Sequence, residues 1–325
     1  MREHPSLSLS RLYGHDKAKR MLNRSLIAGR IPHAYLFRGP EGVGKKLFAK
    51  GLAAALNCRD RQGAEACGLC SSCRKFRSLN HPDFLVISPE KGVIKIDRIR
   101  QLGQELTYPP YESEIRVVVL EDVHTMRREA ANSLLKTLEE PPDNNLLILT
   151  AESSKEVLST LVSRCQVVPF AGLSLADTTA ILIAHGLAPD TAPLLARLSE
   201  GSPGRALLLQ NTEMVALWHD VVRVLSDSSV DPDRDVGVIL RLAEAVAGLK
   251  DDLPSFFGLL KIWVRDLLLA DDGGVPVGSM PENRRKSWNS SQLFAKLQAI
   301  GRAEKELARN CNKNLLCEVL LFNLQ

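Results

Sequence analysis

Gly39-Pro-Glu-Gly-Val-Gly44-Lys45-Lys46 is the stretch of this 325-residue sequence that decides the fold. An apolar segment over residues 34–37 leads into it, and residues 47–56 continue with the apolar spacing of a helix. A glycine-rich loop between a strand and a helix is typical of a phosphate-binding loop, whose backbone N–H groups surround the phosphates while a lysine contacts the outer ones. The candidate nucleotide contacts in this loop are Gly39, Gly42, Gly44, Lys45 and Lys46.

The last residue of this motif departs from the usual pattern. Position 46 normally carries Ser or Thr, whose hydroxyl group holds Mg²⁺. Lys46 has three hydrogen-bond donors and no acceptor, and its positive charge repels a metal ion. The loop therefore keeps the groups that bind ATP but has a degenerate metal site. This combination predicts a chain that takes part in an ATP-driven machine without necessarily hydrolysing ATP itself.

A pair of carboxylates follows the apolar run over residues 115–120. In phosphate-loop proteins such a pair holds Mg²⁺ and orients the attacking water. The usual order is Asp then Glu, whereas this chain has Glu121 and then Asp122. Alone, an acidic pair after a strand is more often a solvated strand end. Together with the phosphate loop, we interpret the pair as an altered Walker B motif.

Three further residues are candidates for contact with phosphate charge. Thr150, at the end of a strand predicted over 146–149, could touch a γ-phosphate or its water, although a plain strand-end threonine is nearly as common. Arg164 could be an arginine finger, because a guanidinium group stabilises a transferring phosphoryl group; the alternative is a surface charge. Arg205 lies at the start of a predicted helix and could reach a phosphate on its own subunit; the alternative, a surface arginine in the first turn, is slightly disfavoured by the helix dipole.

Four of the seven cysteines are clustered, with the spacing C-x8-C-x2-C-x2-C. Steps of two intervening residues let thiolates converge on one ion, and four sulfurs complete a tetrahedral structural Zn²⁺ site. A chance run of buried or redox cysteines is the alternative. The predicted zinc ligands are Cys58, Cys67, Cys70 and Cys73, in a module over residues 58–73. Cys165, Cys311 and Cys317 are interpreted as packing residues.

The order of apolar segments predicts an α/β domain followed by an all-α region. Strands are expected at residues 34–37, 84–87, 115–120, 146–149 and 167–168, with helices between them, and Asp97 is expected to cap a helix. This alternation is typical of a doubly wound parallel sheet. We predict a phosphate-loop domain over 1–170, a small helical lid over 171–211 and a helical oligomerisation (collar) domain over 212–325.

Composition is that of a soluble globular protein, with 45% hydrophobic and 25% charged residues and a net charge of +4. The balance permits contact with DNA without demanding it. Arg98 and Arg100, and the cluster Arg284, Arg285 and Lys286, are weak candidates for such contact. The amino terminus lacks the apolar core of a signal peptide, and no run approaches the roughly 18 apolar residues of a membrane span. We therefore expect a cytoplasmic protein.

These motifs, in this order, resemble the bacterial clamp loader subunits of the AAA+ ATPase family. The resemblance covers about residues 1–210 and is weaker in the helical remainder. The phosphate loop and the four-cysteine insertion contribute to it. It also rests on Leu134-Leu-Lys-Thr-Leu-Glu-Glu-Pro-Pro142, Ser163-Arg164-Cys165 and Gly201-Ser-Pro-Gly-Arg-Ala206. ATP-hydrolysing members of that family carry Ser or Thr in place of Lys46, and an Asp-Glu pair.

The resemblance implies a hetero-pentameric ring with gamma/tau and delta clamp loader subunits, acting on a sliding clamp and primed DNA. It implies that Arg164 projects into the ATP site of a neighbouring subunit. It also implies a place in a DNA-directed DNA polymerase (nucleotidyltransferase) holoenzyme, with no independent activity of the chain. Two alternatives remain open: a gamma/tau-like motor that itself hydrolyses ATP, and a zinc-dependent DNA-binding module. We expect an isolated monomer that joins the assembly through its last hundred or so residues.

Overall fold

A computed structural model describes residues 7–154, 157–189, 192–210, 214–227, 236–270, 288–307, 309 and 311–325. Contacts between residues divide the chain into two compact units, Met1–Arg205 and Ala206–Gln325. The division into three domains stays a prediction. The basic cluster Arg284, Arg285 and Lys286 lies outside the described residues. Among the described helices, none combines the length and apolar character that crossing a bilayer requires.

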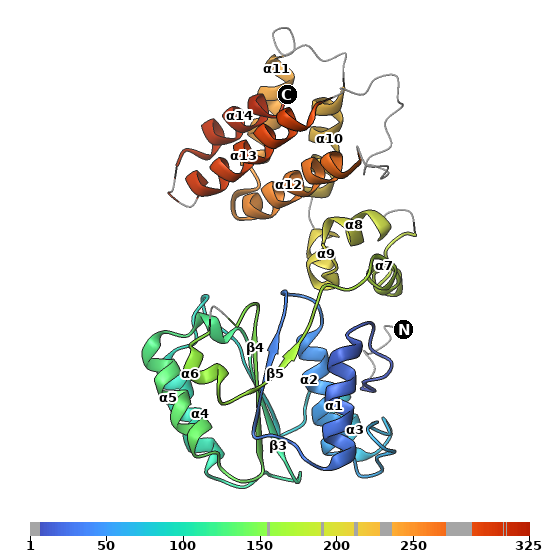
Figure 1. The fold of residues 1–325 in the computed structure, drawn as a ribbon, viewed down its shortest axis with the longest axis vertical. Coiled ribbons are helices and arrows are strands. Elements are labelled where there is room, and N and C mark those ends of the chain that lie inside the picture. Colours follow the sequence, from blue (N-terminus) through green and yellow to red (C-terminus); the bar gives the residue numbers. More distant parts are fainter. Residues whose placement is uncertain are drawn as a thin grey trace. The chain divides into compact units, whose positions relative to one another are not determined.

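The first unit is built around a five-stranded sheet in which every pairing is parallel (Figure 1). The strand order is β2-β3-β4-β1-β5, so the strand before the phosphate loop lies between β4 and β5. All five predicted strands are confirmed within one or two residues at each end. They are β1 (Ala34–Arg38), β2 (Phe84–Ile87), β3 (Arg116–Leu120), β4 (Asn145–Ala151) and β5 (Gln166–Pro169).

Both faces of this sheet are buried, which explains the unbroken apolar runs in its central strands. In β3, Val117 and Val119 pack into the cluster that includes α1 (Asp16–Ala28), α2 (Lys45–Leu56) and α3 (Ser71–Arg77). Val118 and Leu120 point to the opposite face. That face is covered by α4 (Ile96–Leu106), α5 (Arg128–Glu139) and α6 (Ser159–Val162), as Figure 1 shows.

The start of α4 differs from the sequence-based expectation. Lys95 is the residue before the helix, and no side chain caps its first turn, so Asp97 is not the cap. A short antiparallel bridge between Glu90 and Val93 precedes the helix and sets where the chain can turn into it. A 3₁₀ turn, η1 (Val123–Thr125), follows the acidic pair after β3.

Only helices and turns follow β5 among the described residues. In the first unit, α7 (Leu175–Ala184) and α8 (Ala192–Leu198) pack together. The next helix, α9 (Pro203–Gln210), contains the boundary between the two units. These helices are separated at Gly186 and at Gly201–Ser202. The second unit contains α10 (Met214–Ser226), α11 (Val236–Ala247), η2 (Lys250–Asp252), α12 (Leu253–Ala270), α13 (Ser290–Leu307) and α14 (Lys313–Asn323).

Candidate functional site

The phosphate loop follows β1 directly and ends at the first residue of α2. Gly44 precedes the helix with a φ of 105°, a conformation that L side chains rarely adopt. The Lys45 ammonium group lies inside the loop, 8% exposed, and donates to the carbonyl oxygens of Gly39 at 2.6 Å and Pro40 at 2.9 Å. Burial lowers the pKa of Lys45, while the carboxylates of Asp122, Glu152 and Glu41 act against that shift. The loop thus holds a cation at its centre.

Lys46 is paired with the altered Walker B motif. Its Nζ atom lies 3.0 Å from Oε1 of Glu121, and the two side chains are 55% and 20% exposed. The Ser88 hydroxyl, just beyond β2, donates to the other carboxylate oxygen of Glu121 at 2.5 Å. The sequence pattern identifies both members of the pair but does not predict that they touch.

Asp122 and Thr150 meet at the same edge of the sheet. Asp122 has a φ of 50°, in the left-handed region, and its backbone N–H donates to Oγ1 of Thr150 at 3.0 Å. Thr150 is 3% exposed at the carboxyl end of β4. The threonine therefore has a definite structural task, which is to fix the backbone of the acidic pair.

The segment between α8 and α9, together with the start of α9, contacts the outside of the phosphate loop. Ser202 donates from its hydroxyl to the carbonyl oxygen of Glu41 at 2.7 Å, and the Gly204 N–H donates to the carbonyl oxygen of Gly42 at 2.9 Å. A Cβ atom on Gly204 would lie 2.7 Å from the Cα atom of Gly42, so both positions need glycine. Arg205 follows at the start of α9, half-buried, and its N–H donates to the Ser202 hydroxyl.

His15 is a neighbour of the phosphate loop that the sequence does not single out. Its Nε2 atom lies 2.9 Å from the carbonyl oxygen of Val43; since a carbonyl only accepts, this nitrogen carries the proton. The ring packs between Phe48 and Phe170. Burial lowers the pKa of His15, against the raising effect of its contact with Val43. No local motif signals this role, because the contact crosses 28 residues of sequence.

Arg164 lies away from the phosphate loop of its own chain. It precedes β5, at the amino edge of the parallel sheet, whereas the loop follows β1 at the carboxyl edge. Gln166 pairs with Tyr35, so about four residues, or roughly 13 Å, of β1 separate that level from Gly39. The Arg164 side chain is 36% exposed and contacts Glu139 at the end of α5, with Nη2 2.7 Å from Oε1.

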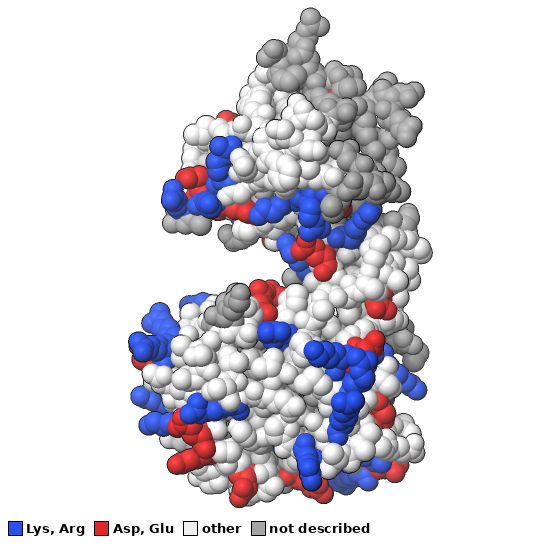
Figure 2. Space-filling view, in the orientation of Figure 1, with Lys and Arg blue, Asp and Glu red and all other residues white. Residues whose placement is uncertain are grey.

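A groove of about 540 Å³, here called the basic groove, lies where the amino-terminal ends of α4 and α5 meet, and its charged lining consists of Lys91, Lys95, Arg100, Arg127, Glu90, Asp97 and Glu129. Neither helix has a side-chain cap, and their N-cap residues, Lys95 and Arg127, are both cationic. Arg100 also lines the groove, 3.9 Å from Asp97, whereas Arg98 is paired with Glu105 and does not line it. Figure 2 shows lysine and arginine side chains gathered along this side of the sheet domain and over α1.

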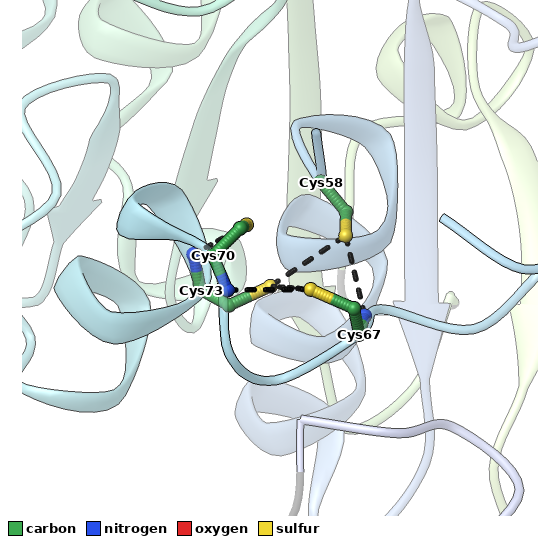
Figure 3. Close-up of side chains that lie close together, drawn as sticks. All are labelled: Cys58, Cys67, Cys70 and Cys73. Atoms are coloured by element: carbon green, nitrogen blue, oxygen red, sulfur yellow. Dashed lines mark hydrogen bonds between the residues drawn. The ribbon is translucent and has the colours of Figure 1, made fainter. Parts of the chain in front are cut away.

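The four predicted zinc ligands come together in space (Figure 3). Their sulfur atoms all lie within 4.8 Å of one another, with 3.7 Å between Cys73 and Cys58 and 3.9 Å between Cys67 and Cys73. Four sulfurs at the usual Zn–S distance of about 2.3 Å would stand about 3.8 Å apart in a tetrahedron, so the cluster fits the ion. Cys58 comes directly after α2, and Cys70 and Cys73 lie at the start of α3.

Backbone N–H groups point to the sulfur atoms of three of these cysteines, and that of Cys67 points to the sulfur of Cys58. The N–H groups of Leu69 and Cys70 point to the sulfur of Cys67, and that of Cys73 points to the sulfur of Cys70. Burial tends to raise the pKa of Cys70, but the N–H of Cys73 and further contacts lower it to about 6. Thiolates are the form that binds zinc. Cys317 is buried, as predicted for a packing residue, while Cys165 and Cys311 are half-buried.

Comparison with known proteins connects this geometry to a family. Residues 14–174, about half of the chain, match the family described as DNA polymerase III, delta subunit. The DNA polymerase III subunit delta' of Bacillus subtilis (strain 168) is 33% identical over 208 residues, which cover 64% of this chain and 63% of that protein. The DNA polymerase III subunit tau of Escherichia coli (strain K12) is 34% identical over 241 residues, or 72% of this chain and 37% of that protein. The chain thus covers less than two thirds of the length of either relative.

A solved structure shares the overall architecture. The crystal structure of a DNA polymerase III gamma subunit-related protein from Thermotoga maritima matches with a TM-score of 0.50 and 17% identity. The match covers 94% of this chain and 97% of that chain. At this level of identity the similarity concerns the fold alone.

Proposed function

Residues 14–174 belong to the DNA polymerase III delta-subunit family, and from this premise we propose that the chain is a delta-prime-type subunit of the bacterial clamp loader. In this role it assists the ATP-dependent loading of a sliding clamp onto primed DNA. It supplies Arg164 as an arginine finger to the ATP site of a neighbouring gamma/tau subunit.

The local chemistry supports a delta-prime rather than a gamma/tau assignment. A motor subunit needs a hydroxyl group and a carboxylate that hold Mg²⁺ at its own phosphate loop. Here Lys46 replaces the residue with the hydroxyl group, and its ammonium group forms an ion pair with Glu121, with Nζ 3.0 Å from Oε1. Residues Gly39, Gly42, Gly44 and Lys45 remain, so nucleotide binding is retained in the proposal, while hydrolysis is assigned to the neighbour.

The position of Arg164 is the observation that carries the proposal. This residue precedes β5, whereas the phosphate loop follows the adjacent parallel strand β1. The two therefore lie at opposite edges of the sheet, and Arg164 is suited to a site on another chain. A guanidinium group delivered in this way is worth on the order of 10³–10⁵ in the rate of phosphoryl transfer.

The basic groove between α4 and α5 supports a contact with primed DNA. Free N–H groups at helix amino termini bind phosphate oxygens, and two such termini converge here. Arg127 adds positive charge beside them, as does Lys95, which lies 3.5 Å from Glu90. We assign the phosphate backbone, rather than the bases, to this groove, because lysines and helix ends carry no sequence information.

The experiment that tests the proposal compares Arg164→Ala with the wild type in a loader reconstituted with gamma/tau and delta subunits. Hydrolysis at the ATP site that receives the finger is expected to fall by on the order of 10³-fold or more, while the subunit still assembles. Pre-steady-state hydrolysis in the presence of clamp and primed DNA separates that site from the others. Arg164→Lys should restore little of the hydrolysis rate, because an ammonium group lacks the planar, forked N–H donors of a guanidinium group.

Arg223→Ala is a matched control, because Arg223 forms a comparable exposed ion pair with Asp220, at 2.6 Å. An Arg164→Ala loader with unchanged hydrolysis would rule out the finger. Steady-state ATP turnover by the isolated chain, abolished by Lys45→Ala, would favour the gamma/tau-like motor instead.

A further inference from the structure

The place where a phosphate-loop protein normally holds a divalent cation is taken up by a side chain. Lys46 lies in the first turn of α2, and its ammonium group is 3.0 Å from Oε1 of Glu121. The Ser88 hydroxyl binds the second oxygen of the same carboxylate. Both carboxylate oxygens of Glu121 are therefore engaged.

The residues present do not fit Mg²⁺. This ion needs oxygen ligands in near-octahedral geometry, and position 46 provides an ammonium group in place of a hydroxyl oxygen. A second cation beside Lys46 would be repelled at short range. We accordingly derive no step through a metal at this site.

The same arrangement supplies positive charge without a metal. A bound triphosphate needs more charge than one lysine offers, and Mg²⁺ normally provides the remainder. Lys45 already stands at the centre of the loop, and Lys46 adds a second ammonium group beside it. Because the Lys46 side chain is 55% exposed, its flexible stem can turn from Glu121 toward a phosphate oxygen.

We propose that this phosphate loop binds nucleoside triphosphate without a divalent cation, with Lys46 acting as a tethered substitute for the metal. Glu121 pairs with the ammonium group while the loop is empty, and Lys46 turns from it to a phosphate oxygen when the triphosphate binds. The inference concerns the chain's own loop and does not depend on Arg164 or on any partner subunit.

The test measures ATP binding to the full-length chain by equilibrium dialysis, with and without Mg²⁺. The metal-free buffer is prepared with cation-exchange resin and not with a chelator, which would also attack the four-cysteine cluster. Wild-type affinity should differ by less than about threefold between the two buffers. Lys46→Thr should bind at least about tenfold more weakly without Mg²⁺ and recover when it is added, since it loses a charged hydrogen-bond donor and regains a hydroxyl group.

Two further variants complete the test. Lys46→Arg keeps the charge and should keep metal-independent binding, whereas Lys17→Thr removes an exposed lysine from α1 and should change nothing. The proposal is overturned if the wild type binds ATP only with Mg²⁺, or if it binds no ATP at millimolar concentration in either buffer. It is equally overturned if Lys46→Thr retains full affinity in the metal-free buffer. None of these results would alter the test of Arg164 in the reconstituted loader.

Discussion

Arg164 contacts residues outside the motif Ser163-Arg164-Cys165, and these contacts cannot be predicted from the motif. Its Nη1 atom donates to the carbonyl oxygen of Thr160 at 3.0 Å, and its Nη2 atom is paired with Glu139. A guanidinium group that serves a neighbouring phosphate must give up or share this carboxylate. In the proposed role of Arg164, Glu139 would compete with the phosphate for the guanidinium group.

We predict that Glu139→Gln raises hydrolysis at the neighbouring ATP site by up to about fivefold. The pair is half-exposed, 36% on Arg164 and 50% on Glu139, so releasing it is worth at most about 1 kcal/mol. The measurement is the ATPase rate of the reconstituted loader. Glu140→Gln is the matched control, since Glu140 is exposed and adjacent. A reduced rate in Glu139→Gln would show instead that the carboxylate positions the finger.

At the scale of elements, we expect the local fold of residues 58–73, the predicted zinc module, to depend on metal binding by its four clustered cysteines. Residues 58–73 are too few to own a hydrophobic core, and only Cys73 among the four ligands is fully buried. The helix that follows, α3, carries Phe76 into the core beneath the sheet. Loss of the metal should therefore loosen α3 as well as the loop.

We predict one zinc ion per chain and its loss in Cys70→Ser. The substitution should cost about 3 kcal/mol, near the upper end of single-residue effects, and lower the melting temperature by about 6–12 °C for a unit of this size. Metal analysis and thermal unfolding measure the two effects. Cys311→Ser, which removes a half-buried thiol from the other unit, should leave the zinc content unchanged. Wild-type protein without zinc would contradict the assignment.

The positions of the strands could be predicted from the sequence, whereas contacts between distant segments could not. Apolar runs and a complete glycine-rich loop are local signals, so β1 to β5 and the start of α2 were predictable. Contacts between distant segments were not. Ser202 reaches Glu41 across 161 residues, and the buried ion pair between Arg116 and Asp83, at 3.9 Å, crosses from β3 to the residue before β2. No periodicity encodes such pairs, because they depend on which strands become neighbours.

The error at Asp97 has the same origin. An aspartate before an apolar periodic stretch is a reasonable helix cap, but the turn formed by Glu90 and Val93 precedes an α4 that begins two residues earlier, with Lys95 in the cap position. The uncapped first turn then becomes part of the basic groove. The preference of aspartate for the N-cap position therefore did not decide where α4 begins, because the preceding turn did.

At the scale of the whole molecule, the two units separate the chemistry from the proposed assembly surface. The phosphate loop, Arg164 and the zinc module all belong to Met1–Arg205. The second unit carries an apolar stripe on α14, where Leu315, Val319 and Phe322 are 57%, 52% and 38% exposed. Their spacing of four and three residues puts them on one face of the helix. The opposite face is buried through Cys317, Leu320 and Leu321.

We predict that this stripe joins the chain to its partner subunits, and that Leu315→Asp combined with Val319→Asp weakens assembly. Burying each side chain is worth about 1.5 kcal/mol or more, so the pair should cost at least about 3 kcal/mol, or on the order of 100-fold in affinity. Analytical ultracentrifugation of the reconstituted mixture measures the change. Ile27→Asp on α1 is the control, because Ile27 is 72% exposed in the other unit. Since the substituted helix lies outside the unit that holds the phosphate loop, ATP binding by the isolated variant should equal that of the wild type. Assembly at full strength by the double variant would move the interface elsewhere, whereas a loss of both properties would indicate misfolding and not a lost contact.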